Sequence, residues 1–75
     1  MYMSITEFVN RTMELKEGYE VVHLAASQRN LLDRLLLAAG VKGRYAHGSF
    51  QYTFHAGNFG YTLHKGFLTR VGEVA

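Results

Sequence analysis

The sequence predicts a small α+β domain, an α/β sandwich in which two helices pack on a mixed β-sheet. Two stretches, residues 5–17 and 28–39, place apolar side chains at the helical period. Residues 50–63 alternate between aromatic and polar side chains, which is the strand period. Residues 21–26 form a short apolar run between the helices. The expected order is therefore helix, strand, helix, strand, strand, and 75 residues make one domain, residues 1–75.

The aromatic stretch is expected to form a β-hairpin. Gly57 and Asn58 stand between its two halves, and this pair is typical of a two-residue turn. With that turn, the register pairs Ala56 with Phe59, Phe54 with Tyr61 and Tyr52 with Leu63. All apolar residues from Phe50 to Leu63 then lie on one face. The other face carries polar side chains, namely Gln51, Thr53, His55, Thr62 and His64.

The first helix is expected over residues 5–17. Ser4 and Glu7 have the spacing of a capping box, in which Ser4 accepts a hydrogen bond from the Glu7 amide. Gly18 then terminates the helix as its C-cap. The polar side of the helix carries mainly glutamates, which does not suit an anionic membrane surface.

The run at residues 21–26 is expected to be a strand buried on both faces. A single helix through residues 20–39 is the alternative. Ser27 favours the strand, because it can cap a new helix that begins at Gln28. This second helix is expected over residues 28–39, with Gly40 as its C-cap.

Leu37 breaks the pattern of the second helix, because helical geometry points it to the polar side, near Arg34. A single exposed leucine is ordinary in a soluble protein. Alternatively, Leu37 anchors a partner or a second copy of the chain.

Strand, helix and strand joined by short loops form a right-handed crossover, so the first strand and the hairpin are expected to be parallel. After Lys65 and Gly66, residues 67–71 are compatible with a final strand at the sheet edge. Whether this segment pairs or frays is left open by the sequence.

The sequence carries no recognisable catalytic, metal or cofactor motif. Its four histidines lack metal-ligand spacing, and there is no cysteine. His55 and His64 would stand about 13 Å apart along the hairpin, too far to share one ion. No nucleophile elbow or phosphate loop occurs. We therefore expect neither an enzyme nor a cofactor-binding protein.

The location is expected to be cytoplasmic, with no contact to a membrane. No apolar run approaches the ~20 residues that span a bilayer. The N-terminus lacks the basic and apolar segments of a signal peptide. The absence of cysteine fits a reducing compartment.

The first functional hypothesis is a protein-interaction module, an inhibitor or adaptor that acts as a homodimer or docks on a larger protein. Small size, an unpaired sheet edge and the placement of Leu37 motivate it. Small stand-alone proteins of this kind are often encoded by phages or other mobile elements. The expected partner-binding residues are Leu37, Arg34, His55 and His64.

The alternative hypothesis is nucleic-acid binding by the hairpin half. Residues 1–39 carry four basic and five acidic side chains, a net charge of −1. Residues 40–75 carry four basic and one acidic, a net charge of +3. Because the helices need the aromatic face, the reverse face and its basic ends remain for a polyanion. The residues expected at this site are Lys42, Arg44, Tyr45, Lys65 and Arg70.

Overall fold

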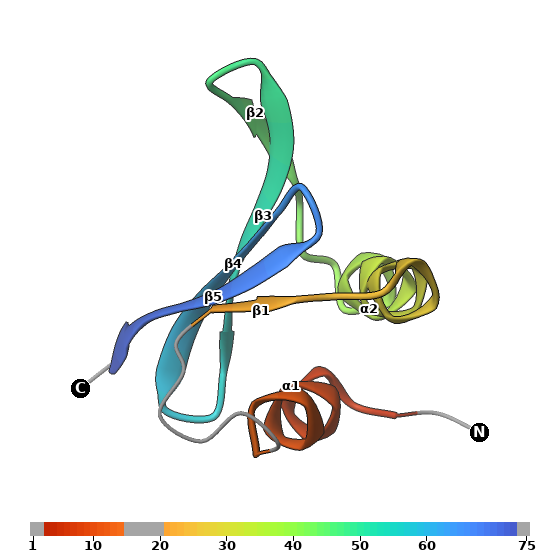
Figure 1. The fold of residues 1–75 in the computed structure, drawn as a ribbon, viewed down its shortest axis with the longest axis vertical. Coiled ribbons are helices and arrows are strands. Elements are labelled where there is room, and N and C mark those ends of the chain that lie inside the picture. The colour runs from red at the N-terminus through yellow and green to blue at the C-terminus, as the bar shows by residue number, and fades with distance from the viewer. Residues whose placement is uncertain (1–2, 15–20, 74–75) are drawn as a thin grey trace.

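Two helices and a five-stranded sheet form two layers in the computed structural model, which describes residues 3–14 and 21–73. Both helices lie on the same side of the sheet (Figure 1). The predicted α+β class is therefore confirmed. In chain order the elements are α1 (Ile5–Glu14), β1 (Val21–His23), α2 (Ala26–Ala38), β2 (Arg44–Ala46), β3 (Ser49–Ala56), β4 (Phe59–His64) and β5 (Phe67–Glu73).

The strands follow the spatial order β1-β5-β4-β3-β2, and every neighbouring pair is antiparallel. The prediction of a mixed sheet is wrong. Helix α2 joins β1 to β2, which run in the same direction but lie at opposite edges with three strands between them. A crossover is present, but its two strands do not pair. The segment expected at the sheet edge is β5, which instead lies between β1 and β4.

Three two-residue turns connect β2, β3, β4 and β5. The turn at Gly57 and Asn58 forms the predicted hairpin, and its register is confirmed at all three predicted pairs. His47 and Lys65 have φ angles of 53° and 52°, and each precedes a glycine with positive φ. Such pairs suit the turns whose twist matches that of paired strands. Strand β2 was not predicted, because its local signal is only the turn at His47 and Gly48.

The hydrophobic core lies between the helices and the sheet. Four strands each contribute a buried residue to one cross-strand row, which consists of Val22, Leu68, Leu63 and Tyr52. From the helices, the buried side chains are Phe8, Val9, Met13, Leu32 and Leu36. Phe50 was expected in this core, but it is 44% exposed. It lies at the level of β2, where its ring packs against those of Tyr45 and Tyr52.

Local hydrogen bonds explain where the two helices begin. The Glu7 amide donates to Ser4 Oγ at 3.0 Å, as the capping-box spacing predicts. Residues 15–18, which include the expected end of this helix, lie outside the described residues. Helix α2 begins earlier than expected, and Ser27 is not its cap. Instead, the Ala25 amide donates to Gln28 Oε1 at 3.1 Å.

The segment between the helices forms a strand, β1, and is not part of a single long helix. The expectation that it is buried on both faces is wrong, because Val22 is buried while Val21 and His23 are exposed. This follows from its position at the edge of a sheet whose helices lie on one side only. Of the helices in the described residues, neither has the length and apolar character needed to cross a membrane.

Two adjacent leucines of α2 provide a test of this packing. Leu36 is fully buried, whereas Leu37 is 65% exposed. We expect Leu36→Ala to lower the free energy of unfolding by about 2–5 kcal/mol, because it leaves a cavity in the core. Leu37→Ala is expected to change it by less than about 0.5 kcal/mol. Urea denaturation measures both values, and equal losses for the two variants would contradict the placement of α2.

Candidate binding surfaces

The side of the sheet that faces away from the helices carries a row of residues that crosses all five strands. His23 pairs with Phe67, Phe67 with His64, His64 with Gln51, and Gln51 with Arg44. Adjacent strands lie about 4.8 Å apart, so the row is about 19 Å long. We call it the open-face row; it consists of His23, Phe67, His64, Gln51 and Arg44.

The centre of the open-face row is aromatic. Phe67 is 46% exposed, and its ring centroid lies 4.7 Å from that of His23 at an interplanar angle of 59°. His64 lies directly opposite Phe67 on β4, and its Nε2 is buried without a hydrogen-bond partner. The neighbouring level of this face carries three aligned hydroxyls, those of Thr53, Thr62 and Thr69. The face thus offers flat rings beside groups that both donate and accept hydrogen bonds.

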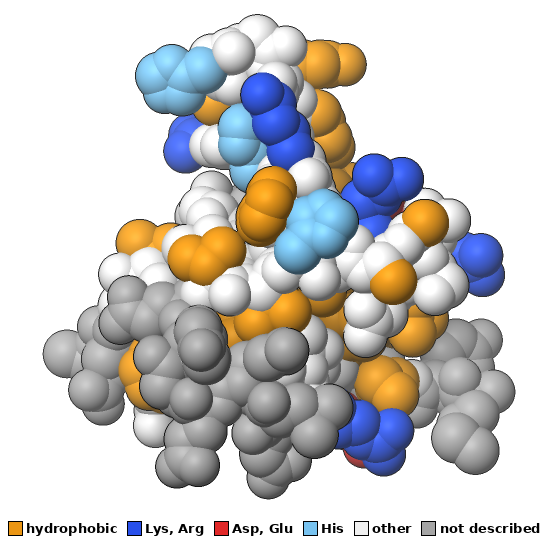
Figure 2. Space-filling view, viewed as in Figure 1, with side chains coloured by type: hydrophobic (Ala, Val, Ile, Leu, Met, Phe, Trp, Pro, Cys, Tyr) orange, Lys and Arg blue, Asp and Glu red, His pale blue; other side chains and the backbone are white. Residues whose placement is uncertain are grey.

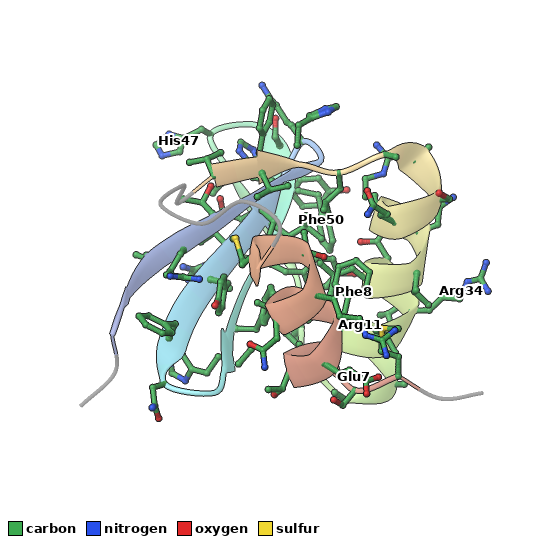
Figure 3. The ribbon with its side chains drawn as sticks, turned by 60° about the horizontal axis from the view of Figure 1, so that its bottom comes forward. Glu7, Phe8, Arg11, Arg34, His47 and Phe50 are labelled. Atoms are coloured by element: carbon green, nitrogen blue, oxygen red, sulfur yellow. The ribbon has the colours of Figure 1, made fainter. Side chains whose placement is uncertain are left out.

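A hollow of about 200 Å³ lies on the other side of the sheet, between α2 and the ends of β3 and β4. We call it the α2 hollow; its lining residues are Arg29, Asp33, Phe50, Tyr52, Leu63, Lys65 and Gly66. Phe50 lies between the sheet and α2 (Figure 3). A Cβ atom at position 43 would overlap the Phe50 ring, so Gly43 permits this ring position.

Charges of both signs line the α2 hollow. Arg29 and Asp33 stand one turn apart on α2, and Lys65 lies in the β4–β5 turn. Burial raises the pKa of the Asp33 carboxyl above its ordinary value of 3.8, and the charge of Arg29 opposes this shift. Two cations and one carboxyl make the lining basic on balance.

The residues expected to bind a protein partner do not form one surface. Leu37 and Arg34 are exposed on α2, and Arg34 points away from the sheet (Figure 3). His55 and His64 lie on the opposite side of the sheet, in the same face as Gln51. The sheet therefore separates the predicted residues into two pairs.

Most residues expected to bind nucleic acid gather at one end of the sheet. Arg44 belongs to the open-face row, Lys65 lies in the adjoining turn, and Lys42 lies two residues before Arg44 in the chain. Tyr45 follows Arg44 but lies on the other face of the sheet, where it pairs with Phe50. Arg70 is separate, because it pairs with Tyr61 on the helix-covered side and its guanidinium lies 4.5 Å from the centre of the Phe59 ring. Figure 2 shows basic and histidine side chains gathered on the upper part of the molecule, with apolar groups among them.

Four residues of these surfaces were not predicted as site residues, namely His23, Phe67, Arg29 and Asp33. A signal for Phe67 was present: a tight turn at Lys65 and Gly66 places it opposite His64. No local signal indicated His23, because its pairing with Phe67 joins segments more than forty residues apart in the chain. Arg29 and Asp33 depend on how α2 packs on the sheet.

Within residues 3–14 and 21–73, no group of three or more His, Cys, Asp or Glu side chains is arranged to hold a metal ion. No protein-family model, curated protein or solved structure matches the chain. Its function is therefore inferred from the geometry of its own residues.

The raised pKa of Asp33 predicts how stability depends on pH. Because the folded protein holds this proton more tightly than the unfolded chain, the contribution is most favourable below about pH 3.8 and is lost as the pH rises through the folded pKa. We therefore expect Asp33→Asn to increase the free energy of unfolding modestly at neutral pH. At about pH 3 the gain should disappear. Denaturation at the two pH values tests this, and a gain of the same size at both would refute the assignment.

Proposed function

We propose that the protein is a non-enzymatic domain that binds single-stranded nucleic acid on its open-face row. The observation that carries the proposal is the register of the sheet, which aligns His23, Phe67 and His64 with Gln51 and Arg44 across all five strands. We therefore favour the nucleic-acid hypothesis, with Phe67 and His23 as the central rings of the binding surface.

Stacking is the first contribution that this surface offers. Proteins that bind single strands often stack bases on aromatic side chains of an exposed sheet, and every base has a face to stack. Phe67 is exposed and flanked by two imidazole rings on neighbouring strands. A base on Phe67 would therefore have a further flat group on either side.

Phosphate contact is the second contribution. Arg44 ends the open-face row at β2, and Lys65 adjoins it in the β4–β5 turn. Lys42 is exposed just before β2. These cations suit the negative backbone of a strand that follows the row, while Gln51 and the threonines supply hydrogen bonds to sugars and base edges.

Binding should weaken when the central ring is removed. We expect Phe67→Ala to weaken binding of a fluorescent oligo-dT about 5–150-fold, the value of one base–aromatic stack. Fluorescence anisotropy at low salt measures the change, with circular dichroism as the check on folding. Leu37→Ala is the matched apolar control and should bind as the parent does. Equal weakening by the two variants would count against the open-face row.

The charge contribution should appear in the salt dependence. If Arg44, Lys65 and Lys42 each contact a phosphate, the logarithm of the affinity should fall with the logarithm of salt concentration at a slope of about −2. Arg44→Ala should make the slope shallower by about 0.7. Arg34→Ala removes the same charge from a side chain that points away from the sheet, and it should leave the slope unchanged. A slope near zero for the parent would exclude phosphate contact.

Protein association is the second candidate function, and the exposure of Leu37 is the observation that favours it. Leu37 is 65% exposed on α2, with the exposed Arg34 three residues before it. Arginine is enriched at interface cores, and the exposed leucine beside it adds apolar area that association would remove from water. On this proposal the protein is a cytoplasmic adaptor or inhibitor that forms a homodimer or docks on a larger protein through α2.

The association proposal predicts the behaviour of Leu37→Glu. This variant should keep the parent's unfolding midpoint, because the side chain already faces solvent. In light scattering the parent should be a dimer and Leu37→Glu a monomer, because a carboxylate buried in the interface would destabilise the dimer. A parent that is monomeric at all concentrations, and that recovers no partner from a lysate, would contradict this second function.

A further inference from the structure

The α2 hollow adjoins the open-face row at a single point, the β4–β5 turn. Lys65 lines the hollow and directly follows His64, while Gly66 lines it and directly precedes Phe67. A nucleic-acid strand bound along the open-face row can therefore reach the α2 hollow by passing over this turn. We propose that the α2 hollow accepts one base of the bound strand and selects guanine. This inference rests on the proposed function and adds a specificity site to it.

The volume and the lining of the hollow suit one nucleobase. Its volume of about 200 Å³ is smaller than the roughly 300–1,000 Å³ of pockets for drug-sized ligands. Its lining includes the buried side chains of Tyr52 and Leu63, and also Phe50, which is 44% exposed. Apolar and aromatic walls of this kind stack against a base and exclude water from its edges.

The polar groups of the hollow are complementary to guanine. Arg29 is a donor only, and an ionised Asp33 is an acceptor only. Guanine presents two acceptors, O6 and N7, which pair with arginine. Its N1–H and 2-amino groups are adjacent donors that match a carboxylate. Adenine has an amine where guanine has O6, so it would place a donor against Arg29.

A bound guanine would supply hydrogen-bond donors to the Asp33 carboxylate. None of the hydrogen bonds formed within residues 3–14 and 21–73 reaches its carboxylate. Burial also removes part of its hydration, and two N–H donors from a base would replace the lost water contacts. Lys65, at the rim, supplies a cation for the phosphate next to that base.

The test uses labelled oligo-dT strands of roughly ten nucleotides that carry one central dG or one central dA. Fluorescence anisotropy with the full chain should give a dissociation constant about 5–100-fold lower for the dG strand. Asp33→Asn should abolish the difference between the dG and dA strands. Glu7→Gln, the matched neutralisation of a carboxylate on α1, should preserve it.

The outcomes separate this inference from the proposed function. Binding of oligo-dT with equal affinity for the dG and dA strands would overturn guanine selection and leave the open-face row supported. A dG preference that survives in Asp33→Asn would also overturn it. If no oligonucleotide binds, the proposed function fails. A titration with guanosine monophosphate followed by NMR then tests whether the hollow binds guanine on its own. Shifts at Arg29 and Asp33 would then sustain a guanine site, and their absence would exclude it.

Discussion

The register of the sheet is the constraint on which the other features depend. Burial of Val22, Leu68, Leu63 and Tyr52 beneath the helices fixes which residues pair across four strands. Successive side chains point to opposite faces, so the residues one position away must lie on the other side. These are His23, Phe67, His64 and Gln51. A slip of one residue would bury the histidines and expose the core, which makes the open-face row as strongly specified as the core itself.

The placement of the two helices leaves one face of the sheet open. Two helices cover one side of a five-stranded sheet, and no other helix of the described residues is present to cover the second side. The exposed side carries mostly threonine, glutamine and histidine, which tolerate water, and it also carries two large apolar side chains, Phe67 at 46% exposure and Val21 at 50%. The same end of the sheet carries Arg44, Lys65 and the α2 hollow. Aromatic rings and positive charge therefore coincide at this end of the sheet.

Local patterns in the sequence were sufficient for the hairpin and both helices, but not for the sheet as a whole. Alternation and the Gly57-Asn58 turn predicted the register of β3 and β4, because both act over a few residues. The position of β5 depends on its pairing with β1, a contact between distant segments that no periodicity encodes. The prediction of a mixed sheet, with β1 parallel to the hairpin, was wrong for the same reason. Phe67 and His23 could be recognised as neighbours only after that pairing was known, and Asp33 joined a site only after α2 was placed.

NMR mapping of a short single-stranded oligonucleotide on the folded protein would locate the binding surface. Amide and ring signals of the open-face row and of Lys65 should shift together, with the largest changes at Phe67, His64 and Lys65. Signals of the exposed side of α2 around Leu37 should stay in place. Shifts confined to α2, or no shifts at low salt, would contradict the assignment of the open sheet face as the binding surface.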